Sequence, residues 1–337
     1  MATLADVARH AGVAASTVSY VLSGKRSVST STRRRVRESI ELLNYQPHAG
    51  ARALASSRSS IIALVVPLRS DVYVPVMMEI AIAVTTTARR YGYDVLLLTN
   101  EEGPEGIRRV AVSARADAII LMDVSMDDDR IPVLRSVGLD AVLIGVPADA
   151  GGLACVDLDF AAAGALCVGH LADLGHREVA FIGQSEAVYR RRSGFAERTL
   201  RGVRDAAAER GLRVVHRPCA ASHEAAAGAV SRILEERPGT TGLIVQNEAI
   251  IPPLLSVLRT AGRTIPEDVS VVAICPSQVA EQTSPQLTAV PVPARDMGEQ
   301  AVELLIRRLA DGVAGEVVLL APELTSRAST APAPVHH

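Results

Sequence analysis

Apolar residues recur at helical spacing near the start of the chain. Leu4, Val7 and Ala11 fall on one face of a helix with 3.6 residues per turn. Thr3 precedes this stripe and is a favoured helix-capping residue, and Gly12 follows it. Because glycine accepts the left-handed conformation that ends many helices, Gly12 is expected to terminate this first helix. The pattern therefore predicts a short helix and a tight turn.

Two more amphipathic stripes follow within the first 44 residues. One covers residues 15–22, and the other begins near Ser29, a good N-cap, and runs to residue 43. Two short helices joined at a glycine turn and braced by a third form a helix-turn-helix unit. Residues 46–60 then become small, basic and serine-rich, which indicates a linker with one or two marginal helical turns.

From residue 61 the pattern changes to an alternation of apolar runs and longer helical stretches. The predicted strands are 61–66, 95–98, 118–122, 141–144, 179–182, 243–245 and 269–274. The predicted helices are about 75–91, 105–115, 160–174, 194–210, 223–236 and 249–261. Regular strand–helix alternation is typical of parallel sheets covered by helices on both faces. This length of α/β chain is expected to form two subdomains, with ligands bound beyond the carboxyl ends of the strands.

The predicted fold class is thus an α/β core of two parallel-sheet subdomains with an all-helical N-terminal domain. We assign residues 1–46 to the helix-turn-helix domain, 47–58 to a hinge, and 59–326 to the core. The remaining residues, 327–337, are rich in Pro, Ala and Ser and are expected to be disordered.

Charge is distributed unevenly along the 337 residues. The net charge is −2, yet residues 1–60 contain nine Lys or Arg and three acidic residues, a net charge of +6. The rest of the chain therefore carries −8. A small basic domain on an acidic body favours contact between that domain and a polyanion, although a solvated helix surface explains the charge about equally well.

Several protein classes are disfavoured by the sequence. The N-terminus has no basic segment followed by an apolar one, so no signal peptide is expected, and the apolar runs are too short to span a bilayer. The four cysteines show no CxxC or metal-binding spacing, which favours reduced thiols in the cytoplasm. We expect no metal and no cofactor.

Longer sequence motifs resemble the LacI/GalR repressors. The first is "TLADVARHAGVAASTVSYVLSGKRSVSTSTRRRVRESIELLNYQPHAGARALA". The others are "HLADLGHREVAFIG", "GLIVQNEA", "IPEDVSVVAI" and "SPQLTAV", in family order and at family spacing over almost the whole chain. The resemblance implies a DNA-binding head, a hinge helix, and a core like that of periplasmic sugar-binding proteins through which the chain dimerises.

The resemblance also places the DNA contacts. Base-reading positions fall on Ala15, Ser16 and Tyr20 of a recognition helix that enters the major groove. Phosphate-contacting positions fall on Thr3, Thr17, Ser19, Ser23, Ser29, Thr32 and Tyr45, with Leu4 assigned to the same surface. Lys25 and Arg26 are expected to add salt-dependent affinity.

Two parts of this surface depart from the family pattern. Many relatives have Arg at the position of Tyr20, where a guanidinium forms a fork to guanine; tyrosine cannot, so a different base preference is expected. In the hinge, Ala51 and Leu54 match minor-groove positions, where paired leucines wedge into the central base step. His48 replaces the usual Asn, which leaves that polar contact open.

Effector contacts are implied at the carboxyl ends of core strands. They fall on Tyr73, Arg191, Asn247 and Cys275, with Asp123, Tyr189 and Gln246 at similar positions. For the last three, a structural hydrogen bond explains the residue at least as well. Cys275 stands where sugar-binding relatives have Asp, and a small buried residue is the simpler interpretation of it. A sugar is the leading effector class by resemblance alone.

Three other functions compete with a repressor. An enzyme is disfavoured because no nucleotide-binding, nucleophile-elbow or HExxH motif occurs, and Asp127, Asp128 and Asp129 have the pattern of a solvated helix start. A periplasmic binding protein is disfavoured by the basic head. The sequence does not separate an activator from a repressor, because the direction of control depends on where the operator lies relative to the promoter. The expected partners are an inverted-repeat operator duplex, a small effector and a second copy of the chain.

Overall fold

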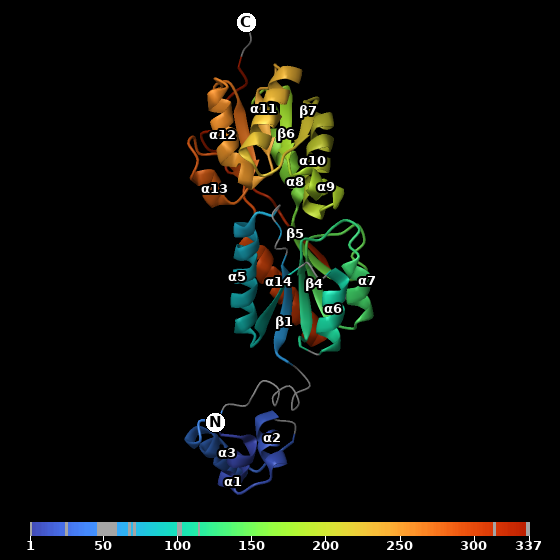
Figure 1. Ribbon diagram of the computed structural model, residues 1–337, viewed down its shortest axis with the longest axis vertical. Helices are drawn as coiled ribbons and strands as arrows, with labels where there is room; N and C mark the ends of the chain where they lie inside the picture. Colours follow the sequence, from blue (N-terminus) through green and yellow to red (C-terminus); the bar gives the residue numbers. More distant parts are fainter. Residues whose placement is uncertain are drawn as a thin grey trace.

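We describe the protein from a computed structural model that covers residues 2–23, 26–45, 59–66, 69, 72–99, 103–113, 115–312 and 315–334. It consists of a cluster of short helices and two α/β subdomains, each built on a parallel sheet (Figure 1). This confirms the fold class that the sequence predicts.

The N-terminal helices are α1 (Leu4–Ala11), α2 (Ala15–Ser23) and α3 (Thr30–Leu42). Thr3 caps α1 as expected: its hydroxyl accepts from the Asp6 amide, while the Asp6 carboxylate accepts from the Thr3 amide at 2.9 Å. Gly12 ends α1 in the left-handed conformation, with φ of 64°. Val7, Val18 and Val36, one from each helix, are fully buried together, so this domain has its own small core.

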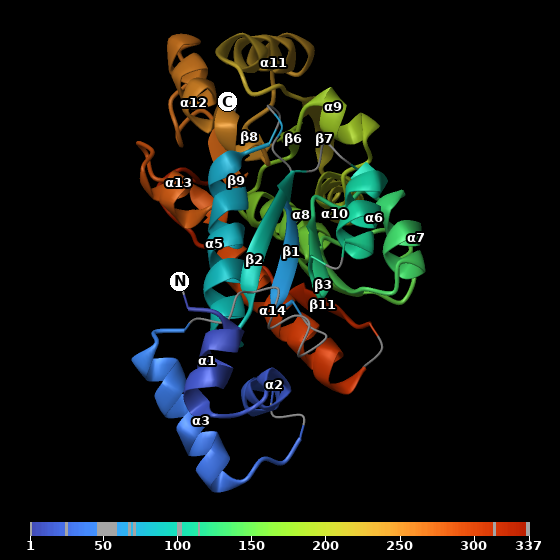
Figure 2. The ribbon, with the colours of Figure 1, turned by 60° about the horizontal axis from the view of Figure 1, so that its bottom comes forward.

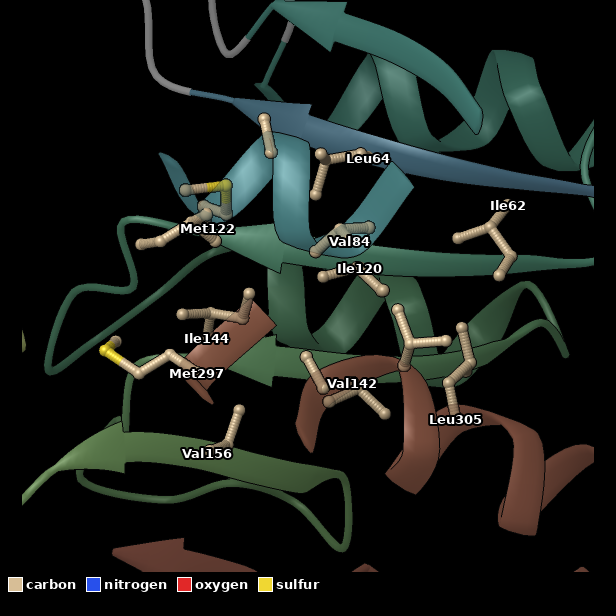
Figure 3. Close-up of a cluster of buried hydrophobic side chains, with 14 of the residues drawn as sticks. Ile62, Leu64, Val84, Ile120, Met122, Val142, Ile144, Val156, Met297 and Leu305 are labelled. Carbon is tan, nitrogen blue, oxygen red and sulfur yellow. The ribbon is translucent and has the colours of Figure 1, made fainter. Parts of the chain in front are cut away.

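The first subdomain carries a six-stranded parallel sheet with strand order β11-β5-β4-β3-β1-β2. Its strands are β1 (Ile61–Val66), β2 (Asp94–Thr99), β3 (Ala118–Met122), β4 (Asp140–Ile144), β5 (Ala154–Leu158) and β11 (Val317–Leu320). Its helices are α5 (Val74–Arg90), α6 (Gly103–Val112), α7 (Arg130–Ser136) and α14 (Ala294–Asp311). α5 and α14 cover one face, where aliphatic side chains such as Ile120 and Leu305 interdigitate (Figure 3), and α6 and α7 cover the other.

The second subdomain repeats this plan with a five-stranded sheet in the order β10-β9-β8-β6-β7. Its strands are β6 (Glu178–Gly183), β7 (Arg213–Pro218), β8 (Gly242–Val245), β9 (Ser270–Ile274) and β10 (Thr288–Val290). Its helices are α8 (Phe160–Asp173), α9 (Glu186–Arg190), α10 (Gly194–Arg210), α11 (His223–Glu236), the 3-10 turn η2 (Glu248–Ile250), α12 (Ile251–Thr260) and α13 (Ser277–Glu281). α8 and α10 cover one face, and α11 and α12 cover the other.

The expected strands and helices of the core are all present within two or three residues of their predicted bounds. Four strands (β5, β7, β10, β11) and four helices (α7, α9, α13, α14) were not predicted. After β10 the chain crosses back from the second subdomain to the first, and α14 begins after Pro293. This helix therefore completes the first subdomain from a distant part of the sequence (Figure 2).

The C-terminal segment differs from its prediction, because residues 327–334 are docked on the second subdomain rather than disordered. Ser329 is fully buried, and its hydroxyl donates to the Val271 carbonyl at 2.6 Å and accepts from the Thr288 amide at 2.8 Å. His176 contacts the carbonyl of Ala331 at 3.2 Å. The small Ser, Thr and Ala side chains let this segment lie close to the sheet and form hydrogen bonds with it.

The acidic run before α7 matches the expected solvated helix start at Asp127 and Asp129, which are exposed, but not at Asp128. Asp128 is buried, and its carboxylate accepts from Nε and Nη2 of buried Arg130 at 2.7 and 2.5 Å. Arg130 also donates to the Asp123 carbonyl at 2.8 Å. The pair joins the end of β3 to the start of α7.

Candidate functional site

The surface of α2 presents the residues assigned to base reading. Ala15 and Ser16, at the first turn, are exposed, while Thr17, Ser19 and Tyr20 are partly exposed. Among residues 15–22 of this helix, Val18 is the buried one, and it packs α2 against α1 and α3. The first turn therefore faces outward, as a helix that enters a groove of DNA requires.

Tyr20 is held by a charged neighbour. The guanidinium of exposed Arg26 lies over the Tyr20 ring, with its central carbon 5.4 Å from the ring centroid. A cation over an aromatic face is a favourable contact. It places a positive charge over the face of the Tyr20 ring.

The other predicted DNA-contact residues of the head differ in how far the structure exposes them. Thr3, Ser29 and Thr32 lie at helix N-termini, where their hydroxyls already serve as capping groups or contact one another. Leu4 packs partly into the head core. Tyr45 is only 4% exposed and belongs to that core, so the structure does not present it as a surface contact. Lys25, His48, Ala51, Leu54 and the side chain of Ser23 lie outside the described residues, as does the hinge assigned to 47–58.

A cavity of about 110 Å³ forms the second candidate site. Its wall combines residues that follow β3, β4 and β5 of the first sheet with residues that follow β6 and β8 of the second. α5 and the first turns of α8, α10 and α14 complete the wall. Most of the lining is apolar, including Met77, Met122, Met297, Phe160 and Phe195.

Four of the seven predicted effector residues line this cavity: Tyr73, Asp123, Arg191 and Gln246. Tyr73 precedes α5, and burial raises the pKa of its hydroxyl, with Glu248 and Cys275 adding to the effect. Asp123 pairs with Arg69. The structure thus brings together residues from positions 73 to 246, and their contact with an effector stays a prediction.

The other three predicted effector residues do not line the cavity. Asn247 is buried and donates its amide to the Cys219 carbonyl at 2.8 Å. Cys275 is fully buried among the aliphatic residues of the second core, which makes it a packing residue. Tyr189 packs edge-on against His216, with ring centroids 4.9 Å apart. For these three the structure shows packing or a backbone hydrogen bond, and their contact with an effector stays a prediction.

Sequence reasoning missed three polar residues of the cavity wall: Asp157, Gln184 and Glu248. Burial raises the pKa of Asp157 to about 7, despite the Leu158 amide and the charge of Arg198, which lower it. Burial likewise raises the pKa of Glu248 to about 7. Asp157 lies within a strand whose other residues are apolar, and only its position at the carboxyl end of β5 could have indicated a site.

Other kinds of site find little support in the described part of the chain. It contains no group of three or more His, Cys, Asp or Glu side chains arranged to hold a metal ion. Each of its helices is too short or too polar to cross a bilayer. The four cysteines are buried and free.

Two protein families match this chain. Residues 3–48 match "Bacterial regulatory proteins, lacI family", and residues 168–330 match "Periplasmic binding protein-like domain". The first match covers the helical head and the second covers most of the second subdomain.

Similar proteins over nearly the whole chain include two transcriptional regulators and a catabolite control protein. The HTH-type transcriptional regulator CelR of Thermobifida fusca is 30% identical over 318 residues, which cover 91% of this chain and 92% of CelR. The HTH-type transcriptional repressor PurR of Photobacterium profundum is 29% identical, with 98% of both chains covered. Catabolite control protein A of Priestia megaterium is 26% identical over 97% of this chain and 99% of the relative.

Solved structures show the same architecture. A CelR–cellobiose complex superposes with a TM-score of 0.70 at 27% identity, covering 98% of this chain and 100% of CelR. A lac repressor dimer bound to operator superposes with a TM-score of 0.83 at 23% identity, covering 98% and 99%. The second match establishes the shared fold.

Proposed function

Because the chain belongs to the LacI family of transcriptional regulators, we propose that it binds an inverted-repeat operator as a homodimer and that a small molecule in the cavity changes its affinity for that operator. The observation that carries the proposal is the fusion of an independent helical head, with an exposed first turn on α2, to two subdomains that share a cavity. A ligand that contacts both subdomains favours one arrangement of them.

The DNA contact is supported by the charge and exposure of the head. Ala15 and Ser16 are free of packing contacts that would hide them, and Arg26 and Arg33 are exposed. Basic side chains supply the salt-dependent affinity, and the first turn of α2 reads bases. Binding to chromosomal DNA would also place the protein in the cytoplasm.

The effector class is suggested by one relative. The structure of CelR with cellobiose is that of a regulator, 27% identical to this chain, in complex with a sugar. A sugar effector would make this chain a repressor of carbohydrate uptake or catabolism genes. The relatives' regulatory function also favours a binding protein over an enzyme.

The homodimer is supported by an exposed apolar stripe on α5. Val74, Met78 and Ile82 recur every four residues and are 45%, 38% and 62% exposed. Beside them, Leu97 on the edge strand β2 is 48% exposed. Adjacent apolar residues on a helix and a sheet edge are typical of an interface, and a second copy of the chain covers them symmetrically.

Replacing Ile82 by Glu is expected to convert the dimer to a monomer at micromolar concentration, because the carboxylate would be buried without a partner at the interface. Light scattering measures the change. Glu79→Gln, at an exposed position of the same helix, is the control and should stay dimeric. An unchanged mass for Ile82→Glu would place the interface elsewhere.

Replacing Tyr20 by Arg is expected to shift the preferred base at one operator position to guanine, because a guanidinium donates two hydrogen bonds to O6 and N7. The preference should change by about 1–3 kcal/mol. Selection from a random duplex pool, with the wild-type chain in parallel, measures it. If both proteins enrich the same half-site, Tyr20 does not face the bases.

The proposal as a whole is tested by titrating the selected operator with the full chain, with and without ligands found by thermal shift. We expect an inverted repeat to be enriched and at least one cavity ligand to change the operator affinity. Substituting Met77→Trp should fill the cavity and abolish the ligand effect while operator binding persists. A ligand effect that survives this substitution would contradict the assignment of the cavity.

A further inference from the structure

The chain enters the core through a bend that one carboxylate holds. Ser59 and Ser60 are the first described residues after the segment assigned to the hinge, and β1 begins directly after them. The Ser59 amide and hydroxyl both donate to Oδ1 of Asp117, at 2.6 and 2.8 Å. The Ser60 amide donates to Oδ2 of the same carboxylate at 2.8 Å. We call these three residues the linker anchor.

The bend itself lies at Ser60, whose φ is 56°. This left-handed conformation is unfavourable for a residue with a side chain, because the β-carbon comes too close to a backbone carbonyl oxygen. Such a residue keeps the conformation only where its surroundings determine it. Ser60 is exposed, so packing does not fix the bend. The Asp117 carboxylate does, since hydrogen bonds to an ionised acceptor are stronger than those to a neutral one.

The linker anchor is attached to the centre of the first sheet. Asp117 directly precedes β3, and β3 pairs in parallel with β1. Ile62 and Leu64 of β1 and Ile120 of β3 are fully buried in one cluster (Figure 3). The Asp117 amide also donates to the Ile61 carbonyl at 2.8 Å. The carboxylate therefore ties the bend to a well-packed part of the subdomain.

The strand that carries the linker anchor also reaches the cavity. β3 ends at Met122, which lines the cavity together with Asp123. Asp117 and Met122 thus lie at the two ends of one buried strand. A change in where the first sheet lies relative to the second therefore moves the linker anchor as well, and with it the point at which the chain leaves the core.

The start of a strand does not by itself require such a bend. β4 lies beside β3 and begins at Asp140, whose carboxylate accepts from Nε of Arg308 at 2.8 Å and whose φ is not left-handed. Among the described residues, four that are not glycine have a left-handed φ. Two of these four, Asn44 and Ser60, lie on either side of the segment between the head and the core. The chain direction is therefore set on both sides of that segment.

We propose that Asp117 is a positioning residue for operator binding: by holding the bend at Ser60, it fixes the direction in which the chain leaves each core and keeps the two heads at the separation of the half-sites. This inference rests on the proposed function, because it takes the chain to bind an inverted repeat as a dimer. The helical repeat of DNA sets the half-site spacing, so the heads must be held at a matching distance. A head that leaves the core in many directions is correctly placed only part of the time, and the apparent affinity falls by that fraction.

Two substitutions release the bend in different ways. Asp117→Asn keeps an oxygen for Ser59 but places an amide NH2 group opposite the Ser60 amide, so that two donors face each other. Ser60→Val leaves the carboxylate in place and disfavours the bend, because β-branched residues rarely adopt a positive φ. We expect each to weaken binding to the operator selected with the wild-type chain by about tenfold, since both subunits lose the bend. Fluorescence anisotropy of a labelled duplex at physiological salt measures the affinity. Wild-type affinity in both variants would overturn the proposal.

The spacing of the half-sites separates positioning from a loss of folded protein. Each chain is titrated onto the selected operator and onto the same operator with one or two extra central base pairs. The wild-type chain should discriminate between the two duplexes, and in both variants the ratio of affinities should fall by about threefold or more, because loosely held heads tolerate altered spacing. A smaller folded fraction would weaken both complexes alike. An unchanged ratio would therefore contradict a positioning role.

A glycine provides the rescue. Glycine adopts a positive φ about as readily as a negative one, so a bend at Gly depends less on the carboxylate. Adding Ser60→Gly to Asp117→Asn should restore the operator affinity to within about threefold of wild type. Asp140→Asn removes a carboxylate from the same end of the same sheet and is the matched control, with no expected effect on affinity or spacing. The absence of any recovery, or an equal loss in the control, would contradict the inference.

Failure of this inference is distinguishable from failure of the proposed function. If the wild-type chain selects an inverted repeat and the Asp117 and Ser60 variants bind it equally well, the linker anchor has no positioning role and the function stands. If the wild-type chain prefers no inverted repeat over scrambled DNA, the proposed function fails, and this inference fails with it.

Discussion

Replacing Arg130 by Met is expected to lower the free energy of unfolding by about 3–5 kcal/mol, because it leaves the Asp128 carboxylate buried without its partner. The two side chains are 6% and 2% exposed, and the guanidinium donates to both carboxylate oxygens. Chemical denaturation of the full chain at neutral pH measures the loss. Arg210→Met, which removes a surface pair with Asp173, is the control and should cost less than about 1 kcal/mol.

The pH dependence of this effect has a defined sign. Burial acts to raise the pKa of Asp128, but the hydrogen bonds and charge of Arg130 and the amides of Ser125 and Arg130 outweigh it and lower the pKa. The stabilisation is therefore complete at neutral pH and is lost as the pH falls through the lowered pKa. The difference between wild type and Arg130→Met should shrink in acid, and a constant difference would show that packing, not charge, accounts for it.

Replacing Gly202 by Ala is expected to destabilise the second subdomain by about 3 kcal/mol, because two helices would have to separate. A β-carbon at Gly202 would lie 2.0 Å from the carbonyl oxygen of Ala161, which is a backbone atom that cannot rotate away. Gly202 lies in α10 and Ala161 in α8, and these helices pack closely together. The midpoint of thermal or denaturant unfolding measures the effect.

The matched control for this substitution is Gly228→Ala in α11, where an added β-carbon meets nothing within 4 Å. That change should stabilise the protein by about 0.5–1 kcal/mol, because alanine favours a helix over glycine. Destabilisation by both substitutions, or by neither, would contradict the account of the α8–α10 contact.

The fold could be predicted from the sequence wherever a local pattern was strong. β1 and β3 are continuous apolar runs, and the sequence placed both strands correctly as residues 61–66 and 118–122. β7 was missed because it lies at the edge of its sheet and its polar residues, Arg213 and His216 among them, break the pattern. α14 was missed although Met297, Ala301 and Leu305 repeat every four residues, since no strand–helix alternation surrounds it.

The candidate site was harder to predict because it depends on contacts between distant residues. Tyr73 and Gln246 were correctly placed at strand or helix ends, and the structure brings both to the cavity. Asn247 is adjacent to Gln246, yet its side chain turns to Cys219. Asp157 lies within an apolar strand, and only the three-dimensional arrangement reveals that it lines the cavity. The docking of Ser329 likewise depends on partners some 40 to 60 residues away.

Competition binding at physiological salt tests most directly whether the chain is a ligand-controlled operator-binding protein. The full chain is titrated onto a duplex enriched by selection and onto a duplex of the same composition in scrambled order, with and without a cavity ligand. We expect the enriched duplex to be an inverted repeat bound about 10³-fold or more tightly than the scrambled one, with that ratio altered by the ligand. Equal affinity for the two duplexes in every condition would contradict this function.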